Sequence, residues 1–281
     1  MKLMRYGTRE GIKTPVMLDG EGQARDVSGM ISDFTPETIP EMQSRLSAID
    51  PRDLPLFDTA GQRVAAPVSQ PRNIWCVGLN YSDHAAESGM PVPEEPILFN
   101  KASGTYCGPN DPLLYSDKMS KLDWEVELGV VIGRAALNVS REAALDHVLG
   151  YCVVNDVSER AWQAERGGQW TKGKSFPNFC PTGPVLVTGD ELGDPGELNL
   201  WTEVNGEKVQ DGSTNKMIFD VATIISYMSE FTRLEVGDLI CTGTPPGVGM
   251  GFKPPRYLKP GDRVRMGIAG LGIQEQTVEP L

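Results

Sequence analysis

The sequence predicts a β-rich α+β protein in which a small N-terminal domain, residues 1–68, precedes a larger domain, residues 69–281. Three observations support this prediction. The apolar runs are mostly short and are separated by many of the 31 glycines and 22 prolines. Two runs, within residues 123–133 and 150–158, are almost continuously apolar, which is typical of strands buried on both faces. Strand-like and helix-like segments do not alternate regularly, so a βαβ series is not expected.

The N-terminal domain is expected to contain a pair of strands and one helix. Residues 13–28 read as a strand, a turn at Asp19-Gly20 and a second strand. Residues 41–49 have the most regular helical spacing of apolar side chains. Residues 63–73 contain two prolines and are expected to link this domain to the next.

In the larger domain, a short helix is expected between the two buried strands at 123–133 and 150–158. Its residues are 140–150, with Ser140 as the N-cap and Gly150 just past the C-terminal end. The histidine in this segment, His147, is interpreted as an ordinary helix residue.

The rest of the larger domain is expected to contain a hairpin, a helix and a glycine-rich loop. Residues 200–212 predict the hairpin, because Asn205-Gly206 suits a type I′ turn between alternating arms. Residues 217–231 have helical periodicity. Residues 238–251 predict a strand that runs into a tight, glycine-rich loop.

Composition limits the expected partners and location. The chain has 26 Lys and Arg against 38 Asp and Glu, a net charge of −12, so neither nucleic acid nor an anionic membrane is expected as a partner. No apolar stretch approaches the roughly 18 residues of a membrane-spanning helix, and the first residues lack the pattern of a signal peptide. The five cysteines are scattered and form no C-x-x-C pair, which favours reduced thiols in a cytoplasmic protein.

Residues 168–175, GQWTKGKS, match the G-x-x-x-x-G-K-[ST] pattern of a nucleotide-binding P-loop. A P-loop needs a strand before it and a helix that begins at its Lys-Ser pair. Here the preceding residues are polar and helix-like, and Pro177 and Pro181 prevent a helix from following. No nucleotide site is therefore predicted.

Three acidic residues lie on the two most apolar predicted strands. Glu125 and Glu127 are two residues apart, so they project from the same face, and Asp156 ends the other strand. Buried carboxylates repel one another unless a cation neutralises them. Three carboxylates suit a hard cation such as Mg²⁺ or Mn²⁺. On a solvated strand the same spacing would have no function, and the spacing alone leaves both interpretations open.

His84 lies in a short polar segment and is followed by Glu87 three residues later. If the segment is helical, the two side chains share a face, and the carboxylate can orient the imidazole and raise its basicity. A general base is assembled in this way. A capped turn at the surface is the alternative that these residues leave open.

Six segments resemble, in order, motifs of the fumarylacetoacetate hydrolase family, and the match runs from about Ile74 to the C-terminus. They are CVGLNYSDHAAE, DWEVELGVVIG, GYCVVNDVSERAWQ, KGKSFPNFCPTGP, VNGEKVQDGSTNKMIF and CTGTPPGVG. The resemblance implies a mixed β-sandwich roll with a small N-terminal domain, and a homodimer or higher homo-oligomer.

The resemblance also implies a role for each residue that matches a motif. The family's ligands for Mg²⁺ or Mn²⁺ fall on Glu125, Glu127 and Asp156. Its catalytic residues fall on His84, Glu87 and Lys174. Its substrate-binding residues fall on Arg160, Gln163 and Thr244. The chain departs from the pattern after GKSF, where many members carry Asp-Thr and this chain has Pro177-Asn178.

The activity that the resemblance implies is metal-dependent cleavage of the C3–C4 bond of a 2,4-diketo acid, which releases pyruvate. His84, oriented by Glu87, would take a proton from the water that attacks the C4 carbonyl. Lys174 and Gln163 would stabilise the oxyanion. Residues 2–7 and 251–262 are similar to members that act on 2,4-diketo-3-deoxy-L-fuconate and L-rhamnonate and release pyruvate and lactate.

Other activities remain open on the same scaffold. They are acylpyruvate hydrolysis, oxaloacetate decarboxylation, keto–enol isomerisation and ureidoglycolate lyase chemistry. A metal-binding paralogue without turnover would belong to a different class, and the intact His84–Glu87 pair argues against it.

Overall fold

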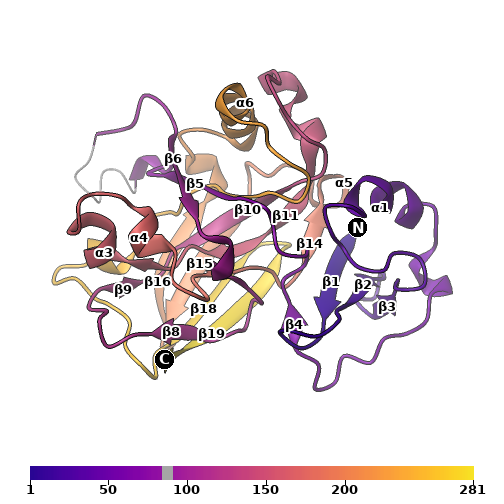
Figure 1. Cartoon of the computed structure of the whole chain (residues 1–281), viewed down its shortest axis with the longest axis horizontal. Coiled ribbons are helices and arrows are strands. Elements are labelled where there is room, and N and C mark those ends of the chain that lie inside the picture. Colours follow the sequence, from indigo (N-terminus) through magenta and orange to yellow (C-terminus); the bar gives the residue numbers. More distant parts are fainter. Residues whose placement is uncertain (84–90) are drawn as a thin grey trace.

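The computed structural model describes residues 1–83 and 91–281, and its largest feature is a ten-stranded sheet (Figure 1). The strand order is β3-β2-β1-β14-β11-β10-β17-β5-β6, and β4 pairs with β1 beside this path. These strands are β1 (Lys2–Tyr6), β2 (Thr14–Leu18), β3 (Ala24–Asp26), β4 (Val64–Ala65), β5 (Ile74–Gly78), β6 (Ile97–Lys101), β10 (Val126–Ile132), β11 (Val148–Asn155), β14 (Leu186–Thr188) and β17 (Leu239–Cys241).

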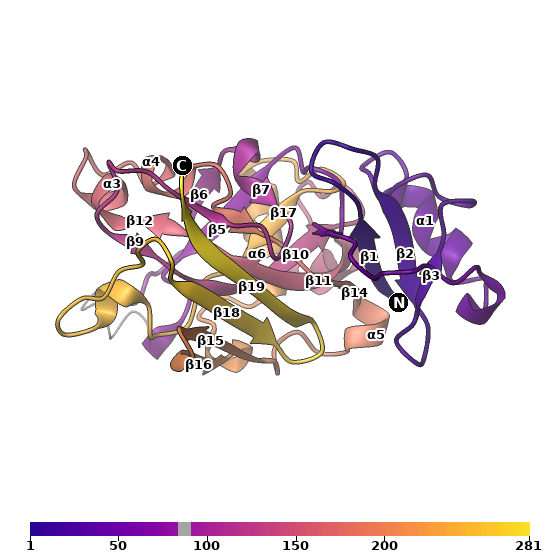
Figure 2. The same ribbon diagram turned by 90° about the horizontal axis from the view of Figure 1, so that it is seen from below.

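A five-stranded sheet packs against one face of the large sheet, in the order β16-β15-β18-β19-β8. Its strands are β8 (Leu113–Tyr115), β15 (Asn199–Val204), β16 (Glu207–Ser213), β18 (Arg263–Ile268) and β19 (Gly272–Pro280). Figure 2 shows β18 and β19 in front of β10 and β11, with β15 and β16 following at the lower edge of the view. Two short pairs complete the strands, β9 (Leu122–Asp123) with β12 (Ser158–Glu159), and β7 (Tyr106–Cys107) with β13 (Cys180–Pro181).

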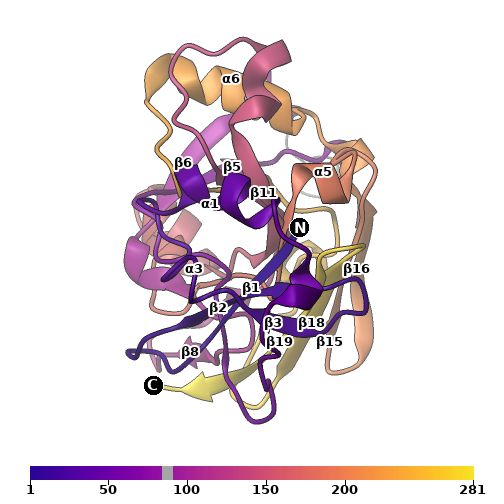
Figure 3. The ribbon, with the colours of Figure 1, turned by 90° about the vertical axis from the view of Figure 1, so that its right-hand side faces the viewer.

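Helices are short and lie around the sheets. The α-helices are α1 (Ile39–Leu46), α3 (Arg160–Ala164), α4 (Thr171–Lys174), α5 (Gly189–Leu192) and α6 (Val221–Phe231). The 3-10 helices are η1 (Pro51–Asp53), η2 (Ser103–Thr105), η3 (Arg141–His147), η4 (Thr214–Lys216) and η5 (Gly249–Gly251). Figure 3 shows α6 at the end of the molecule opposite β15 and β18. No helix within the described ranges is long and apolar enough to cross a membrane.

Strand β10 is buried on both faces because two apolar cores lie on either side of it. Val126, Leu128 and Val130 pack into the core between the two sheets. Val131 points to the opposite face, where it shares a core with residues of the N-terminal strands and of α1. This arrangement confirms the predicted β-rich α+β fold and explains why residues 126–132 are almost continuously apolar.

The N-terminal segment joins the large sheet through β1, a strand that the sequence analysis did not predict. β1 pairs with β2 along one edge, and its other edge pairs with β14 of the larger domain and with β4. The helix predicted at residues 41–49 forms as α1, and its buried face consists of Ile39, Met42 and Leu46. Because the sheet runs through both parts, the boundary at residue 68 stays a prediction.

Several predicted elements of the larger domain are confirmed. The hairpin is β15 and β16, and Asn205 and Gly206 have φ angles of 53° and 82°, as a type I′ turn requires. The helix predicted at residues 217–231 forms as α6. The P-loop-like segment does not begin a helix at its Lys-Ser pair, because α4 ends at Lys174.

Two predictions about residues 123–158 need correction. The strand at 123–133 is interrupted at Trp124-Glu125, which separates β9 from β10. Gly150 does not follow a helix but lies inside β11, opposite Thr188 of β14, after a 3-10 helix that ends at His147. A Cβ atom at position 150 would lie 2.4 Å from the backbone oxygen of Val187. The glycine therefore permits the close approach of β14 and has no capping role.

We predict that Gly150→Ala lowers the free energy of unfolding by about 1–3 kcal/mol, because the added methyl group meets backbone that cannot move aside easily. Urea denaturation monitored by circular dichroism measures the change. Gly104→Ala is the matched control, since no atom lies within 4 Å of a Cβ at that position, and it should stay within about 0.5 kcal/mol of wild type. Equal stability of the two variants would contradict the packing argument.

Candidate metal centre and active-site cavity

Strand pairing brings the three predicted carboxylates together. Antiparallel β10 and β11 place Val126 opposite Asn155, so Glu125 and Asp156 are neighbours just beyond this pair. The backbone N–H of Asp156 donates to the Glu125 carbonyl oxygen at 2.9 Å. One carboxylate oxygen from each of Glu125, Glu127 and Asp156 lies within 4.8 Å of the other two, and all three residues are buried. The spacing seen in the sequence therefore yields a compact oxygen-ligand set.

Without a cation, the three buried carboxylates repel one another. Burial, followed by the charges of Asp156 and Glu125, raises the pKa of Glu127 well above its usual range. A hydrogen bond from the backbone N–H of Gly243 at 2.8 Å opposes this effect only in part. Three buried oxygen donors with no thiolate or imidazole among them fit a hard divalent cation such as Mg²⁺ or Mn²⁺.

Lys174 lies against two of the carboxylates. Its Nζ is 2.7 Å from Glu125 Oε2 and 2.8 Å from Asp156 Oδ2, and its side chain is 2% exposed. Burial acts to lower the pKa of Lys174, but Asp156 and Glu125 outweigh it and raise the pKa above its ordinary value. The lysine of the P-loop-like segment is therefore a permanent cation of this site.

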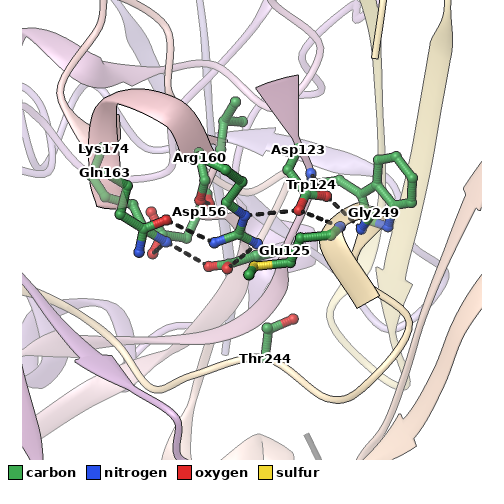
Figure 4. Close-up of polar contacts among 12 residues, drawn as sticks. Asp123, Trp124, Glu125, Asp156, Arg160, Gln163, Lys174, Thr244 and Gly249 are labelled. Atoms are coloured by element: carbon green, nitrogen blue, oxygen red, sulfur yellow. Dashed lines mark hydrogen bonds and ion pairs between the residues drawn. The ribbon is translucent and has the colours of Figure 1, made fainter. Parts of the chain in front are cut away.

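Arg160 fixes the side chains on both sides of it, as Figure 4 shows. Its Nε donates to Asp123 Oδ2 at 2.8 Å, and its Nη1 donates to Gln163 Oε1 at 3.0 Å. Its Nη2 forms an ion pair with Glu125 Oε1 at 2.6 Å. Nε and Nη1 thus have hydrogen-bond acceptors, whereas the buried Nη2 has the ion pair with Glu125 but no hydrogen-bond geometry. These contacts make Arg160 a positioning residue in this arrangement.

Two charged residues of the site were missed by the sequence analysis. Lys101, at the end of β6, is completely buried, forms an ion pair with Asp156 and donates to the Val157 carbonyl oxygen at 3.1 Å. Asp123 accepts hydrogen bonds from Arg160 and from the backbone N–H groups of Gly249, at 2.6 Å, and Met250, at 3.1 Å. The signals were a lysine that closes an apolar run and an aspartate directly before the E-x-E motif.

A cavity of about 270 Å³ lies over the carboxylates. Every predicted site residue within the described ranges lines it: Glu125, Glu127, Asp156, Arg160, Gln163, Lys174 and Thr244. The Thr244 hydroxyl donates to the Val126 carbonyl oxygen at 2.8 Å and accepts from Gln210, so its proton is already used within the protein. The remaining lining is Val77, Gly78, Leu79, Phe99, Ala164, Trp170, Gly243 and Met250.

The remaining residues that the sequence analysis singled out have two different outcomes. His84 and Glu87 fall outside the described residues, so their predicted place stays a prediction. Asn178, of the Pro177-Asn178 pair, is buried away from the cavity lining, with φ of 65°. Its amide donates to the Pro112 carbonyl oxygen at 2.8 Å and accepts from Arg9. Asn178 therefore connects a turn to neighbouring segments.

The fumarylacetoacetate hydrolase C-terminal family model matches residues 73–279. A Burkholderia multivorans protein that carries only the provisional name of hydrolase is 52% identical over 278 residues, which cover 98% of each chain.

Solved structures resemble the whole chain. A fumarylacetoacetate hydrolase from Exiguobacterium antarcticum is 38% identical with a TM-score of 0.88, and all of both chains are covered. A 2-hydroxyhepta-2,4-diene-1,7-dioate isomerase from Mycobacterium marinum is 33% identical with a TM-score of 0.77, covering 100% of this chain and 98% of the other. A maleylpyruvate hydrolase from Sphingobium sp. SYK-6, in complex with manganese(II) and pyruvate, is 25% identical with a TM-score of 0.83, covering 100% and 99%.

We predict that Glu127→Gln weakens Mg²⁺ and Mn²⁺ binding by more than the roughly 10–100-fold that the loss of an outer-shell partner costs. Isothermal titration calorimetry measures the affinity. The metal-free variant should be at least as stable as wild type, because one of three mutually repelling carboxylates is gone. Glu230→Gln, on the exposed side of α6, is the control. Unchanged Mn²⁺ affinity in Glu127→Gln would remove Glu127 from the ligand set.

Proposed function

The chain belongs to the fumarylacetoacetate hydrolase family, and we propose that it is a Mg²⁺- or Mn²⁺-dependent hydrolase that cleaves the C3–C4 bond of a 2,4-diketo acid to release pyruvate. The observation that carries the proposal is the buried Glu125–Glu127–Asp156 set at the wall of a cavity. The Sphingobium relative, whose structure contains manganese(II) and pyruvate, supports both the type of ion and the product.

A divalent ion on the three carboxylates would act as a Lewis acid toward the carbonyl oxygens of the substrate. The protein's own donors would stabilise the oxyanion at the carbonyl that water attacks. Lys174 has two of its three N–H groups directed at Glu125 and Asp156, and the third remains for a ligand. A donor placed in this way typically contributes about 3–4 kcal/mol to transition-state stabilisation.

Gln163 is a second donor whose orientation the structure explains. Its Oε1 accepts from Arg160 Nη1 at 3.0 Å, so the amide NH₂ is the end left for the cavity. Arg160 is in turn held by Asp123 and Glu125. In the proposed reaction, Arg160 therefore orients Gln163, while Gln163 and Lys174 contact the reacting oxygen.

His84 is the proposed general base, oriented by Glu87. Water would lose a proton to the imidazole as it attacks the C4 carbonyl, and the C3–C4 bond would then break with the pyruvate enolate as the leaving fragment. The enolate would take the proton back from the imidazolium at C3 to give pyruvate. We further propose a homodimer or higher homo-oligomer in the cytoplasm, as the family resemblance and the cysteine usage suggest.

The acyl half of the substrate is a finer proposal. Segments 2–7 and 251–262 favour a 2,4-diketo-3-deoxy sugar acid of the L-fuconate or L-rhamnonate type, whose second product is lactate. The second candidate is keto–enol isomerisation, which the Mycobacterium marinum isomerase favours at 33% identity. Decarboxylation of oxaloacetate uses the same pyruvate half and is tested in the same experiment.

We predict EDTA-sensitive release of pyruvate from 2,4-diketo acids. The assay couples pyruvate to lactate dehydrogenase in Mg²⁺ or Mn²⁺, with diketo-deoxy sugar acids, simple acylpyruvates and oxaloacetate as substrates. Release from oxaloacetate alone would replace hydrolysis with decarboxylation. Absorbance changes from the enol form without any pyruvate would replace it with isomerisation.

We predict that His84→Ala lowers kcat by about 10²–10⁴-fold while metal affinity is unchanged, because the general base is lost and the ligands remain. Glu87→Gln should give a smaller decrease, since the imidazole keeps its place but loses its orienting charge. Stopped-flow or steady-state rates measure kcat, and calorimetry measures metal affinity. A His84→Ala variant with near wild-type kcat would end the assignment.

A further inference from the structure

Resting on the proposed function, we infer that the substrate carries one carboxylate only, on its pyruvate half, and that its acyl half is uncharged and packs against Trp170. Two independent features of the cavity lead to this inference. One is the charge balance of the buried site, and the other is the composition of the cavity wall.

The buried charges leave room for one substrate carboxylate. Within the described residues, the site contains four carboxylates, on Asp123, Glu125, Glu127 and Asp156, and three cations, on Lys101, Arg160 and Lys174. With all four carboxylates ionised, as they would be around a metal ion, the cluster has one excess negative charge. A divalent cation changes this to one excess positive charge, which a single carboxylate neutralises. A second carboxylate would be an unpaired buried anion, which is strongly unfavourable.

No cation of the described site is left for a second carboxylate. Lys101 is committed to Asp156 and the Val157 carbonyl oxygen, and the charge of Arg160 is already offset by ion pairs with Asp123 and Glu125. Lys174 keeps one N–H, which the reacting oxygen requires. Maleylpyruvate, the compound in the name of the Sphingobium relative, does carry a second carboxylate, which makes it a useful comparison substrate.

The rest of the cavity wall is apolar, and Trp170 is its largest side chain. The apolar lining consists of Val77, Leu79, Phe99, Ala164, Trp170 and Met250. Trp170 packs edge-to-face on Phe99 with ring centroids 5.3 Å apart. The ring also covers Gly78, where a Cβ atom would lie 2.4 Å from it. Trp170 is therefore held by close contacts, and it limits how large an acyl group the cavity accepts.

The backbone conformation of Leu79 indicates that the fold holds this part of the cavity wall in place. Its φ angle of 53° lies in the left-handed region, which is uncommon for a branched side chain. Such a conformation persists where the surroundings hold it in place and is concentrated at ligand sites. The adjacent Asn80 supplies that restraint, because its amide donates to the carbonyl oxygens of Thr242 and Phe219 at 2.8 and 2.9 Å. A lactoyl or a short alkanoyl group is uncharged and fits such a wall.

The first test compares binding of two uncleavable 2-oxo acids of equal length, 2-oxohexanoate and 2-oxoadipate, which differ by a terminal carboxylate. We expect the Mn²⁺-loaded enzyme to bind 2-oxohexanoate at least about tenfold more tightly by calorimetry, with a change in tryptophan fluorescence that Trp170→Phe reduces. Equal or tighter binding of 2-oxoadipate would overturn the inference. This result does not depend on turnover, so it stands apart from the outcome of the pyruvate assay.

The second test measures kcat/KM for acetylpyruvate, benzoylpyruvate and maleylpyruvate. We expect wild type to prefer a substrate with an uncharged acyl group over maleylpyruvate by about 10²-fold or more, as an unpaired buried charge typically costs. Trp170→Ala should raise the ratio for benzoylpyruvate over acetylpyruvate, and Trp170→Arg should raise the ratio for maleylpyruvate over acetylpyruvate. Trp201→Ala, on β15 beside Arg265, is the control that should leave both ratios unchanged. If the Trp170 variants leave both kcat/KM ratios unchanged, the proposed role of Trp170 is overturned. If Trp170→Ala does not fold, Trp170→Phe replaces it in the test.

Discussion

The mutual repulsion of carboxylates in a dry interior is the constraint on which the rest of this structure depends. Glu125, Glu127 and Asp156 are each at least 95% buried, and their oxygens crowd within 4.8 Å. Buried charge is tolerated only when partners surround it. Three long cationic side chains surround these carboxylates and Asp123, so the four carboxylates exceed the cations by one. The formal charges of the site are thus balanced only when a cation and an anionic ligand are both bound.

Several separate elements of the fold supply the charged side chains of the site. The pairing of β10 and β11 places the carboxylates, and β6 brings Lys101 to Asp156. The short helices α3 and α4 carry Arg160 and Lys174. Helices of four or five residues have little stability of their own, so ion pairs to the sheet hold them in place. Asp123 then extends the network to the glycine-rich loop through the backbone N–H groups of Gly249 and Met250.

The sequence revealed those features whose signal is local. The carboxylates were visible because charged residues are anomalous within apolar strands, and the Asn205-Gly206 turn because its backbone demands are specific. Lys101 was not visible, since a lysine at a strand end is ordinary and its partner, Asp156, is 55 residues away. Gly150 was misread for a related reason: the close approach of β14 that requires a glycine is a tertiary contact.

The same charge balance connects the binding of the cofactor and of the substrate. In the metal-free cavity the raised pKa of Glu127 favours its neutral form, so the cluster has no excess positive charge to attract a substrate carboxylate. With a divalent cation in place and all ligands ionised, one carboxylate is attracted at short range in a low-dielectric site. The cation therefore favours binding of the substrate carboxylate. The apolar wall at Trp170 and Leu79 excludes water from this exchange, which strengthens each charge interaction within the cavity. Selectivity for one carboxylate and preference for an uncharged acyl group are thus two consequences of one buried network.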